Sequence, residues 1–390
     1  MCAIFLCLTN SGAVAQSTSS TNRSRQFGPD ACGPADPTYI RVASETGGLP
    51  MFLQPAEAAK AFHLVRESTR NNMGTVLWAT GTLDAKPQSF EVPVDSVTKR
   101  VTFSLSVDTK GTKLVLTQPS GGAIVEATAN NEITELNCGR IVTVSAPEAG
   151  IWRTQITGTG RFWIEVQAES DIHIISAEFV KKGGRPGHEG LFRISGQPLA
   201  GIPAILQVSL AAEQVETAEF RLVSDRGDTI QELRMKPENS DRDSREYVGS
   251  LEPPSRPFRV AVYGRDSKKQ SYQRFFPALF HAETVEVLAE HDSDELSAGN
   301  TTTLTFTLRN IGPPNNFKIT VTDGHQFVSH VSSQELALGT GESKTLRVEL
   351  TVPVGTAAGT GDDIVVVAAG TAPSGTSNSS VVHLSVSVSQ

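Results

Sequence analysis

Residues 101–118 read "VTFSLSVDTKGTKLVLTQ", and apolar and polar side chains alternate along this stretch. Successive side chains of a β-strand point to opposite sides, so one face of the first strand would carry Val101, Phe103, Leu105 and Val107. The following "TKGT" contains a glycine suited to a turn, and "KLVLTQ" alternates again. The stretch predicts two strands joined by a hairpin, within a sheet that has one apolar and one polar face.

The period of two continues outward from this stretch. Residues 86–182 are predicted to form one antiparallel β domain, in which "TGTG" at 157–160 makes a second hairpin turn. Short strands at sandwich spacing follow in residues 188–282, after the glycine-rich linker "KKGGRPGHEG". Residues 283–390 alternate most regularly, with Leu304, Phe306 and Leu308 facing inward. The predicted fold class is mainly β, built of tandem β-sandwiches.

Residues 1–75 have a different, helical pattern. Asp36 is a suitable N-cap and Gly47 a suitable end for a helix over 34–47. A buried strand is expected at 49–53, and a helix from Pro55 whose inner face carries Ala58, Phe62 and Val65. With a further strand at 3–8, the order is β-α-β-α, which is typical of an α/β domain.

Two parallel strands are too few for an independent sheet. We therefore interpret residues 1–75 as the end of an α/β domain whose earlier part is missing from this chain. The alternative is that the apolar N-terminus is a signal peptide cleaved after Ala13-Val14-Ala15.

Composition limits the partners. The 390 residues carry a formal net charge of −8, so there is no basic surplus to neutralise the phosphates of a nucleic acid or an anionic membrane. No apolar stretch is long enough to span a bilayer.

Catalytic and metal motifs are not recognisable. The eight histidines show no zinc spacing, and the acidic run "EHDSDELSAG" at 290–299 does not have the spacing of an EF-hand. Neither a nucleophile elbow nor a phosphate-binding loop occurs. The sequence thus predicts no enzyme, no metal and no cofactor.

Cysteines and sequons give weaker indications. Cys2 and Cys7 lie an odd number of residues apart on one expected strand and would face opposite sides, which disfavours their pairing. A bridge between Cys32 and Cys138 is possible, although sequence alone cannot fix it. Glycosylation sequons begin at Asn22, Asn300 and Asn378.

The tripeptide Arg226-Gly227-Asp228 lies between two expected strands, "AEFRLVS" and "TIQELRM". Asp225 and Gly227 suit a turn, which accounts for both without a receptor. The same turn would hold Arg226 and Asp228 out in water, as in the integrin-binding signal that this tripeptide resembles. Both interpretations stay open.

Several runs taken together resemble hemicentin and von Willebrand factor A domain-containing protein 7. The most specific are "PEAGIW", "GIPAILQVSL" and "GRDSKKQSYQRFF". The resemblance implies the end of a von Willebrand A-like domain (1–75), a galactose-binding-like sandwich (86–182) and two Ig-like sandwiches (188–282 and 283–390). It also implies a secreted, non-enzymatic matrix or adhesion protein, with extracellular proteins or glycans as the partners. The family's metal-binding Asp-x-Ser-x-Ser loop does not occur in this chain.

A second function remains open at this point. The sandwiches could be carbohydrate-binding accessory modules of a larger secreted protein or enzyme, with Trp152 or Trp163 stacking on a sugar ring. For these two tryptophans themselves, packing in the core is the favoured role.

Overall fold

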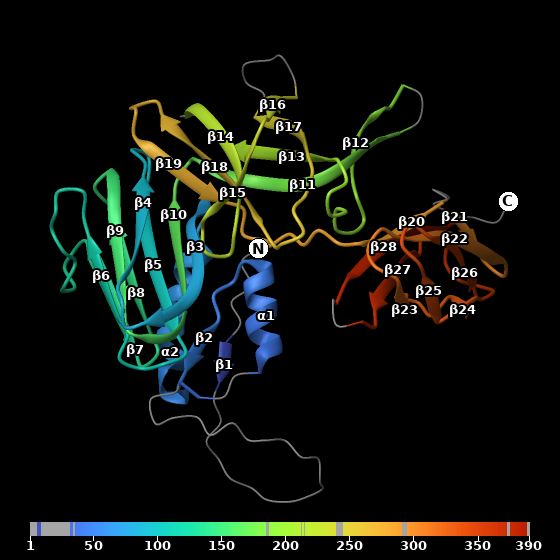
Figure 1. The fold of residues 1–390 in the computed structure, drawn as a ribbon, viewed down its shortest axis with the longest axis horizontal. Coiled ribbons are helices and arrows are strands. Elements are labelled where there is room, and N and C mark those ends of the chain that lie inside the picture. The colour runs from blue at the N-terminus through green and yellow to red at the C-terminus, as the bar shows by residue number, and fades with distance from the viewer. Residues whose placement is uncertain are drawn as a thin grey trace, which may run out of the picture. The chain divides into compact units, whose positions relative to one another are not determined.

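The computed structural model describes residues 6–8, 32–33, 36–184, 187–211, 213, 215–238, 245–290, 295–372 and 375–387. Strands account for 58% of the described residues and helices for 7%, so the predicted mainly β fold is confirmed (Figure 1). The chain divides into two compact units. Unit 1 consists of Met1–Ala177, Gln207–Gly249 and Pro257–Phe280, and unit 2 consists of Glu178–Leu206, Ser250–Arg256 and His281–Gln390. None of the described helices is long and apolar enough to cross a membrane.

The N-terminal segment has the expected order of elements. They are β1 (Leu6–Leu8), α1 (Pro37–Thr46), β2 (Met51–Leu53), a 3-10 turn η1 (Pro55–Glu57) and α2 (Ala58–Ser68). Strands β1 and β2 pair in parallel. The side chain of Asp36 accepts the N–H of Thr38, and Gly47 ends α1 in the left-handed conformation at φ 81°. Both predicted ends of α1 are therefore confirmed.

The predicted inner face of α2 is wrong. Phe62 is 70% exposed, whereas the buried residues of this helix are Ala61, His63, Leu64 and Glu67. The buried face of the helix is therefore partly polar. The sheet against which the helix packs, described below, explains this.

A nine-stranded antiparallel sheet forms the main layer of unit 1, in the order β15-β14-β18-β19-β3-β10-β5-β8-β7. Its strands are β3 (Met73–Asp84), β5 (Arg100–Val107), β7 (Asn131–Leu136), β8 (Gly139–Ser145), β10 (Thr159–Glu169), β14 (Val215–Val223), β15 (Thr229–Leu233), β18 (Arg259–Asp266) and β19 (Ser271–Phe275). The sheet thus contains strands from two of the predicted domains. The division into residues 1–75, 86–182, 188–282 and 283–390 stays a prediction.

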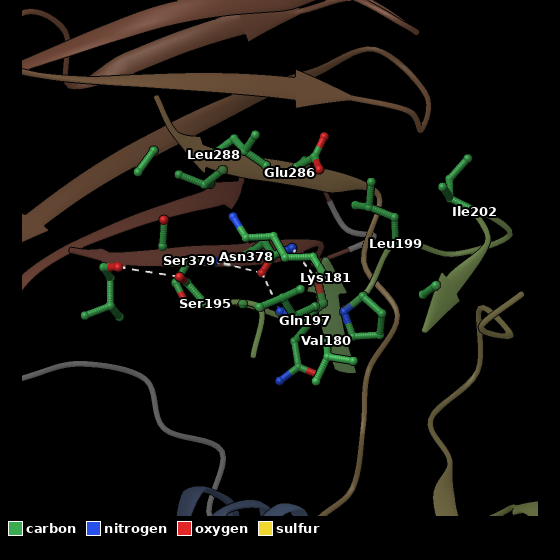
Figure 2. A pocket seen from close by; sticks show the side chains of 18 of the residues that line it. Val180, Lys181, Ser195, Gln197, Leu199, Ile202, Glu286, Leu288, Asn378 and Ser379 are labelled. Carbon is green, nitrogen blue, oxygen red and sulfur yellow. Dashed lines mark hydrogen bonds between the residues drawn. The ribbon is translucent and has the colours of Figure 1, made fainter. Parts of the chain in front are cut away.

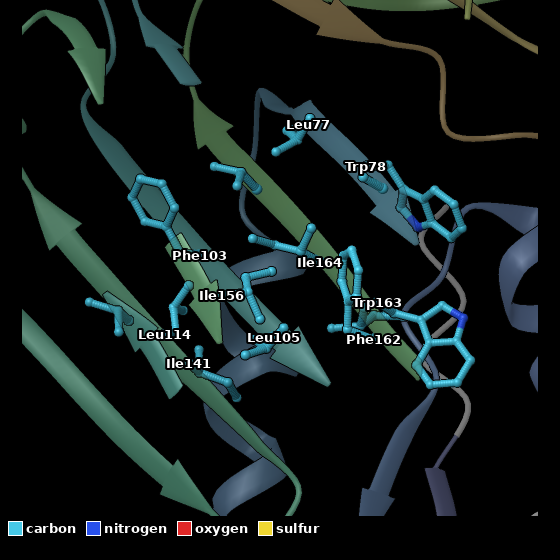
Figure 3. Close-up of a cluster of buried hydrophobic side chains, with 14 of the residues drawn as sticks. Leu77, Trp78, Phe103, Leu105, Leu114, Ile141, Ile156, Phe162, Trp163 and Ile164 are labelled. Atoms are coloured by element: carbon cyan, nitrogen blue, oxygen red, sulfur yellow. The ribbon is translucent and has the colours of Figure 1, made fainter. Parts of the chain in front are cut away.

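A three-stranded sheet packs against part of this layer. It consists of β4 (Gln88–Val94), β6 (Lys113–Thr117) and β9 (Gly150–Thr157), in the order β4-β9-β6. Figure 3 shows the apolar core, in which Phe103 and Ile164 come from the large sheet and Leu114 and Ile156 from the small one. The apolar face predicted for the strand at 101–107 is buried in this core.

Neither predicted turn in this region joins a hairpin. "TKGT" lies between β5 and β6, and "TGTG" lies between β9 and β10, but each pair is split between the two sheets. Both loops therefore cross from one layer to the other. They also lie close together, because a Cβ on Gly160 would stand 2.2 Å from Oγ1 of Thr109. Gly160 has φ 87°, so this position needs glycine for its backbone angle as well.

The polar face of the large sheet is also buried, contrary to expectation. Thr102, Ser104, Thr143 and Gln167 are almost fully buried. Helix α2 covers part of this face: Nε2 of His63 lies 3.0 Å from the hydroxyl of Thr143, and the hydroxyl of Ser68 donates to Oε1 of Gln167 at 3.0 Å. The polar face of helix α2 therefore packs against the polar face of the sheet, because buried polar groups need hydrogen-bond partners.

A five-stranded sheet has the order β12-β11-β13-β17-β16. Its strands are β11 (His173–Gly183), β12 (Gly190–Arg193), β13 (Ala204–Ala211), β16 (Lys236–Pro237) and β17 (Glu246–Leu251).

The C-terminal part of unit 2 is a sandwich of two further sheets. One has the order β20-β22-β26-β24, and the other β21-β28-β27-β23-β25. The strands are β20 (Val285–Ala289), β21 (Glu295–Ser297), β22 (Thr301–Asn310), β23 (Asn315–Thr322), β24 (Val328–Val331), β25 (Glu335–Leu338), β26 (Ser343–Thr351), β27 (Gly361–Gly370) and β28 (Ser377–Ser387). Leu304, Phe306 and Leu308 are buried between the sheets, as predicted.

Candidate interaction site

The tripeptide lies in the loop between β14 and β15, which pair antiparallel. The N–H of Gly227 donates to the carbonyl of Ser224 at 3.0 Å, and the N–H of Ser224 donates to the carbonyl of Asp228 at 2.9 Å. Gly227 has φ 83°, a backbone conformation that glycine adopts without strain. The first residue of the turn is therefore Ser224, one position before the expected Asp225.

Further hydrogen bonds fix the backbone of this turn. Oγ of Ser224 accepts the N–H groups of Arg226 and Asp228, each at 3.2 Å. The N–H of Thr80 on β3 donates to the carbonyl of Asp225 at 2.9 Å. The side chains of Arg226 and Asp228 are exposed. A cation and a carboxylate are thus presented to solvent on a backbone that is hydrogen-bonded on two sides.

A buried cation interacts with the same turn. The guanidinium of Arg259 stacks on Trp78 at 3.9 Å from the ring centroid, and its Nη2 donates to the carbonyl of Ser44 at 2.6 Å. Burial lowers the pKa of Arg259 to about 10, and the carboxylates of Glu165 and Asp225 partly oppose that effect. Asp225, Arg226 and Asp228 are all exposed, so the loop presents two carboxylates and one guanidinium to solvent.

The tryptophans proposed as a sugar platform are buried. Trp152 has 0% exposure, and its Nε1 donates to the carbonyl of Glu148 at 2.8 Å. Trp163 is 3% exposed and packs against Phe52. Neither ring can stack on a sugar in solvent, so the carbohydrate-binding alternative loses its candidate residues.

The sequons differ in accessibility. Asn300 is exposed, and its glycosylation stays a prediction. Asn378 is 5% exposed, and its Nδ2 donates to the carbonyls of Gln197 and Val285 at 3.1 and 2.9 Å. A glycan on Nδ2 would break these bonds, which disfavours glycosylation at Asn378. Asn22 falls outside the described residues.

Cys32 and Cys138 form a disulfide in the structure, and both are buried. Cys2 and the end of the expected leader fall outside the part of the chain that is described. So do Asp292 and Asp294 of the acidic run. Among the described residues, no group of three or more His, Cys, Asp or Glu side chains could hold a metal ion.

Two family models match this chain. Residues 75–171 match the hemicentin galactose-binding domain-like family, and residues 285–388 match the VWA7 Ig-like domain. The resemblance expected from the sequence is thereby confirmed for these two segments.

Individual relatives agree with the hemicentin-like assignment. Hemicentin-1 of Mus musculus is 24% identical over 249 residues, and hemicentin-1 of Homo sapiens is 23% identical over 246 residues. In both cases the alignment covers 62% of this chain but only 4% of the relative. A solved Escherichia coli alpha-2-macroglobulin is 10% identical, with a TM-score of 0.25, over 81% of this chain and 33% of its own. At that TM-score the likeness carries no argument about the fold.

Proposed function

We propose that this chain is a non-enzymatic segment of an extracellular structural or adhesion protein, and that its β-sandwich surfaces make contacts with other proteins. The observation that carries the proposal is the succession of a hemicentin-type galactose-binding-like domain and a VWA7-type Ig-like domain in one chain. A buried disulfide supports an oxidising, extracellular location.

The buried carboxylate of Glu165 supports a structural role for this residue over a catalytic one. Burial raises the pKa of Glu165 to about 7, a value that a general acid or base could use. However, the side chain is fully buried, and its Oε1 accepts hydrogen bonds from Gln167 and Thr75. A substrate could not reach it, which favours a role in packing.

The turn of residues 224–228 is the proposed contact site. An integrin reads a cation and a carboxylate on an exposed loop, with the carboxylate completing a metal shell on the receptor. The exposed Arg226 and Asp228 and the fixed backbone between them suit that recognition.

Cell attachment tests this site. Cells are plated on the purified chain, on Asp228→Glu and on Asp84→Glu, in which an exposed aspartate outside the tripeptide changes in the same way. We expect Asp228→Glu to reduce attachment at least tenfold, because the longer side chain displaces the carboxylate, and Asp84→Glu to leave it unchanged. Equal attachment to all three proteins would rule out this turn as an integrin site. A glycan array on the same proteins would separate protein contacts from sugar binding.

A further inference from the structure

A groove of about 600 Å³ lies within unit 2 (Figure 2). Its walls come from separate parts of the chain, namely residues 180–182 of β11, 194–199, 202–205, 286–289 of β20 and 378–383 of β28. No short motif brings these segments together, so sequence reasoning could not find the groove.

Hydrogen bonds hold the walls of the groove in place. Oδ1 of Asn378 accepts the N–H of Gln197 at 2.8 Å, while Nδ2 donates to the carbonyls of Gln197 and Val285. The hydroxyl of Ser195 donates to the carbonyl of Val381 at 3.4 Å. One buried amide thus joins three of the walls, and the groove exists before any partner arrives.

One wall is the edge of strand β20, where the carbonyl of Val285 already accepts a hydrogen bond from Nδ2 of Asn378. Among the described strands, β20 pairs only with β22 and lies at the end of its sheet. The carbonyl of Thr284 accepts the N–H of Ile311, and the N–H of Glu290 donates to the carbonyl of Thr305, so the even-numbered residues of β20 bond to β22. Alternate residues of an antiparallel strand point their backbone groups to opposite sides. The N–H and carbonyl groups of Val287 and Ala289 therefore face away from β22.

The side chains of the walls are apolar with a basic margin. Leu288 and Ile202 are 44% and 40% exposed, although both are large aliphatic residues. Lys181 and Lys182 are exposed on one wall, opposite the single carboxylate of Glu286, and Figure 2 draws Lys181 and Glu286 among the lining side chains. The groove therefore offers apolar contacts and the exposed ammonium group of Lys181.

We propose that this groove binds an extended segment of a partner protein, which adds to the open edge of β20 as a further strand. Backbone pairing with Val287 and Ala289 would supply affinity, and alternate side chains of the segment would enter the groove. Apolar side chains suit Leu288 and Ile202, and an acidic side chain suits Lys181. The proposal deepens the contact role proposed above by naming the partner's chemistry, and it does not depend on the tripeptide.

Peptide selection tests the proposal. A library of random decapeptides displayed on phage is panned against the full chain, and the dissociation constants of selected peptides are measured by fluorescence anisotropy. We expect sequences with alternating apolar residues and at least one Asp or Glu. Ala289→Pro removes an N–H that faces away from β22, so it should spare the sheet and weaken binding at least tenfold. Lys181→Glu should weaken binding similarly.

Matched variants separate groove binding from other effects. Lys318→Glu makes the same charge change on β23, outside the groove, and should not alter binding. Leu288→Glu changes a side chain that is already half exposed, so it tests the groove even if Ala289→Pro misfolds.

Failure to enrich any sequence would overturn the proposal, as would selected peptides that bind every variant equally. If the chain self-associates with rising concentration and Leu288→Glu abolishes this, a second copy of the chain occupies the groove. That outcome would also overturn the proposal. Cell attachment through the tripeptide would stand in each case.

Discussion

Glu165 on β10 is a fully buried carboxylate with a strongly raised pKa. Burial is the largest influence on its pKa and raises it to about 7, against the lowering effect of Arg259 and of hydrogen bonds from Gln167 and Thr75. The alternation of β10 places this residue on the face opposite Ile164, which looked like a solvent face in the sequence. Glu165 is buried because other parts of the protein pack over that face. The alternation of side chains within one strand cannot predict what packs over it.

The raised pKa predicts a stability that depends on pH. Because the folded state holds the proton more tightly than the unfolded state, Glu165 contributes stability below pH 4.5, and the contribution is lost as pH rises through about 7. Each pKa unit corresponds to about 1.4 kcal/mol, so the loss is about 3 kcal/mol. Glu165→Gln cannot ionise and should unfold at the same temperature as the unaltered chain near pH 4.5 but several degrees higher at pH 8.

Thermal unfolding followed by circular dichroism from pH 4.5 to 8.5 measures this difference. Glu91→Gln provides the control, because Glu91 is exposed on β4 and should show no comparable trend. A constant difference between Glu165→Gln and the unaltered chain would show that Glu165 stays charged in the fold. Any pH dependence that comes from other groups is common to the compared proteins and cancels.

At the scale of elements, the ends of helix α1 were predictable from the sequence, but the buried face of helix α2 was not. The caps of α1 were predictable because Asp36 and Gly47 act through local backbone chemistry. The inner face of α2 was not, because it depends on the side chains of a sheet distant in sequence. Similarly, alternation identified the strands, but whether a turn joins neighbours or crosses between layers depends on the second sheet.

Two substitutions in α2 test which face is buried. The sequence pattern predicts the larger loss of stability for Phe62→Ala, whereas the structure predicts it for Leu64→Ala. Leu64→Ala removes a side chain that is 2% exposed and should lower the free energy of unfolding by about 2–5 kcal/mol. Phe62→Ala removes a larger side chain that is 70% exposed and should change it by less than about 0.5 kcal/mol. Urea unfolding at pH 7 distinguishes them. A loss of several kcal/mol for Phe62→Ala would mean that its ring is buried in solution.

At the scale of the whole molecule, two clusters of buried apolar residues among the described residues lie in different units. One lies in unit 1 and includes Cys32 and Cys138, and the other lies in unit 2 between Val285 and Val386. The groove belongs to unit 2 and the tripeptide turn to unit 1. The two proposed contact sites therefore depend on different cores, and a variant that weakens one core should leave the other site intact.

The disulfide provides the test of this independence. It closes a loop with a sequence separation of 106 residues, for which the chain-entropy model gives about 4–5 kcal/mol. We expect calorimetry to resolve two transitions, and replacement of Cys32 and Cys138 by alanine to lower only one of them, by roughly 10 °C for a unit of this size. Phe306→Ala, in the other cluster, should lower only the other transition. If either change lowers both transitions together, the two cores unfold as one cooperative body, and the two contact sites cannot be lost separately.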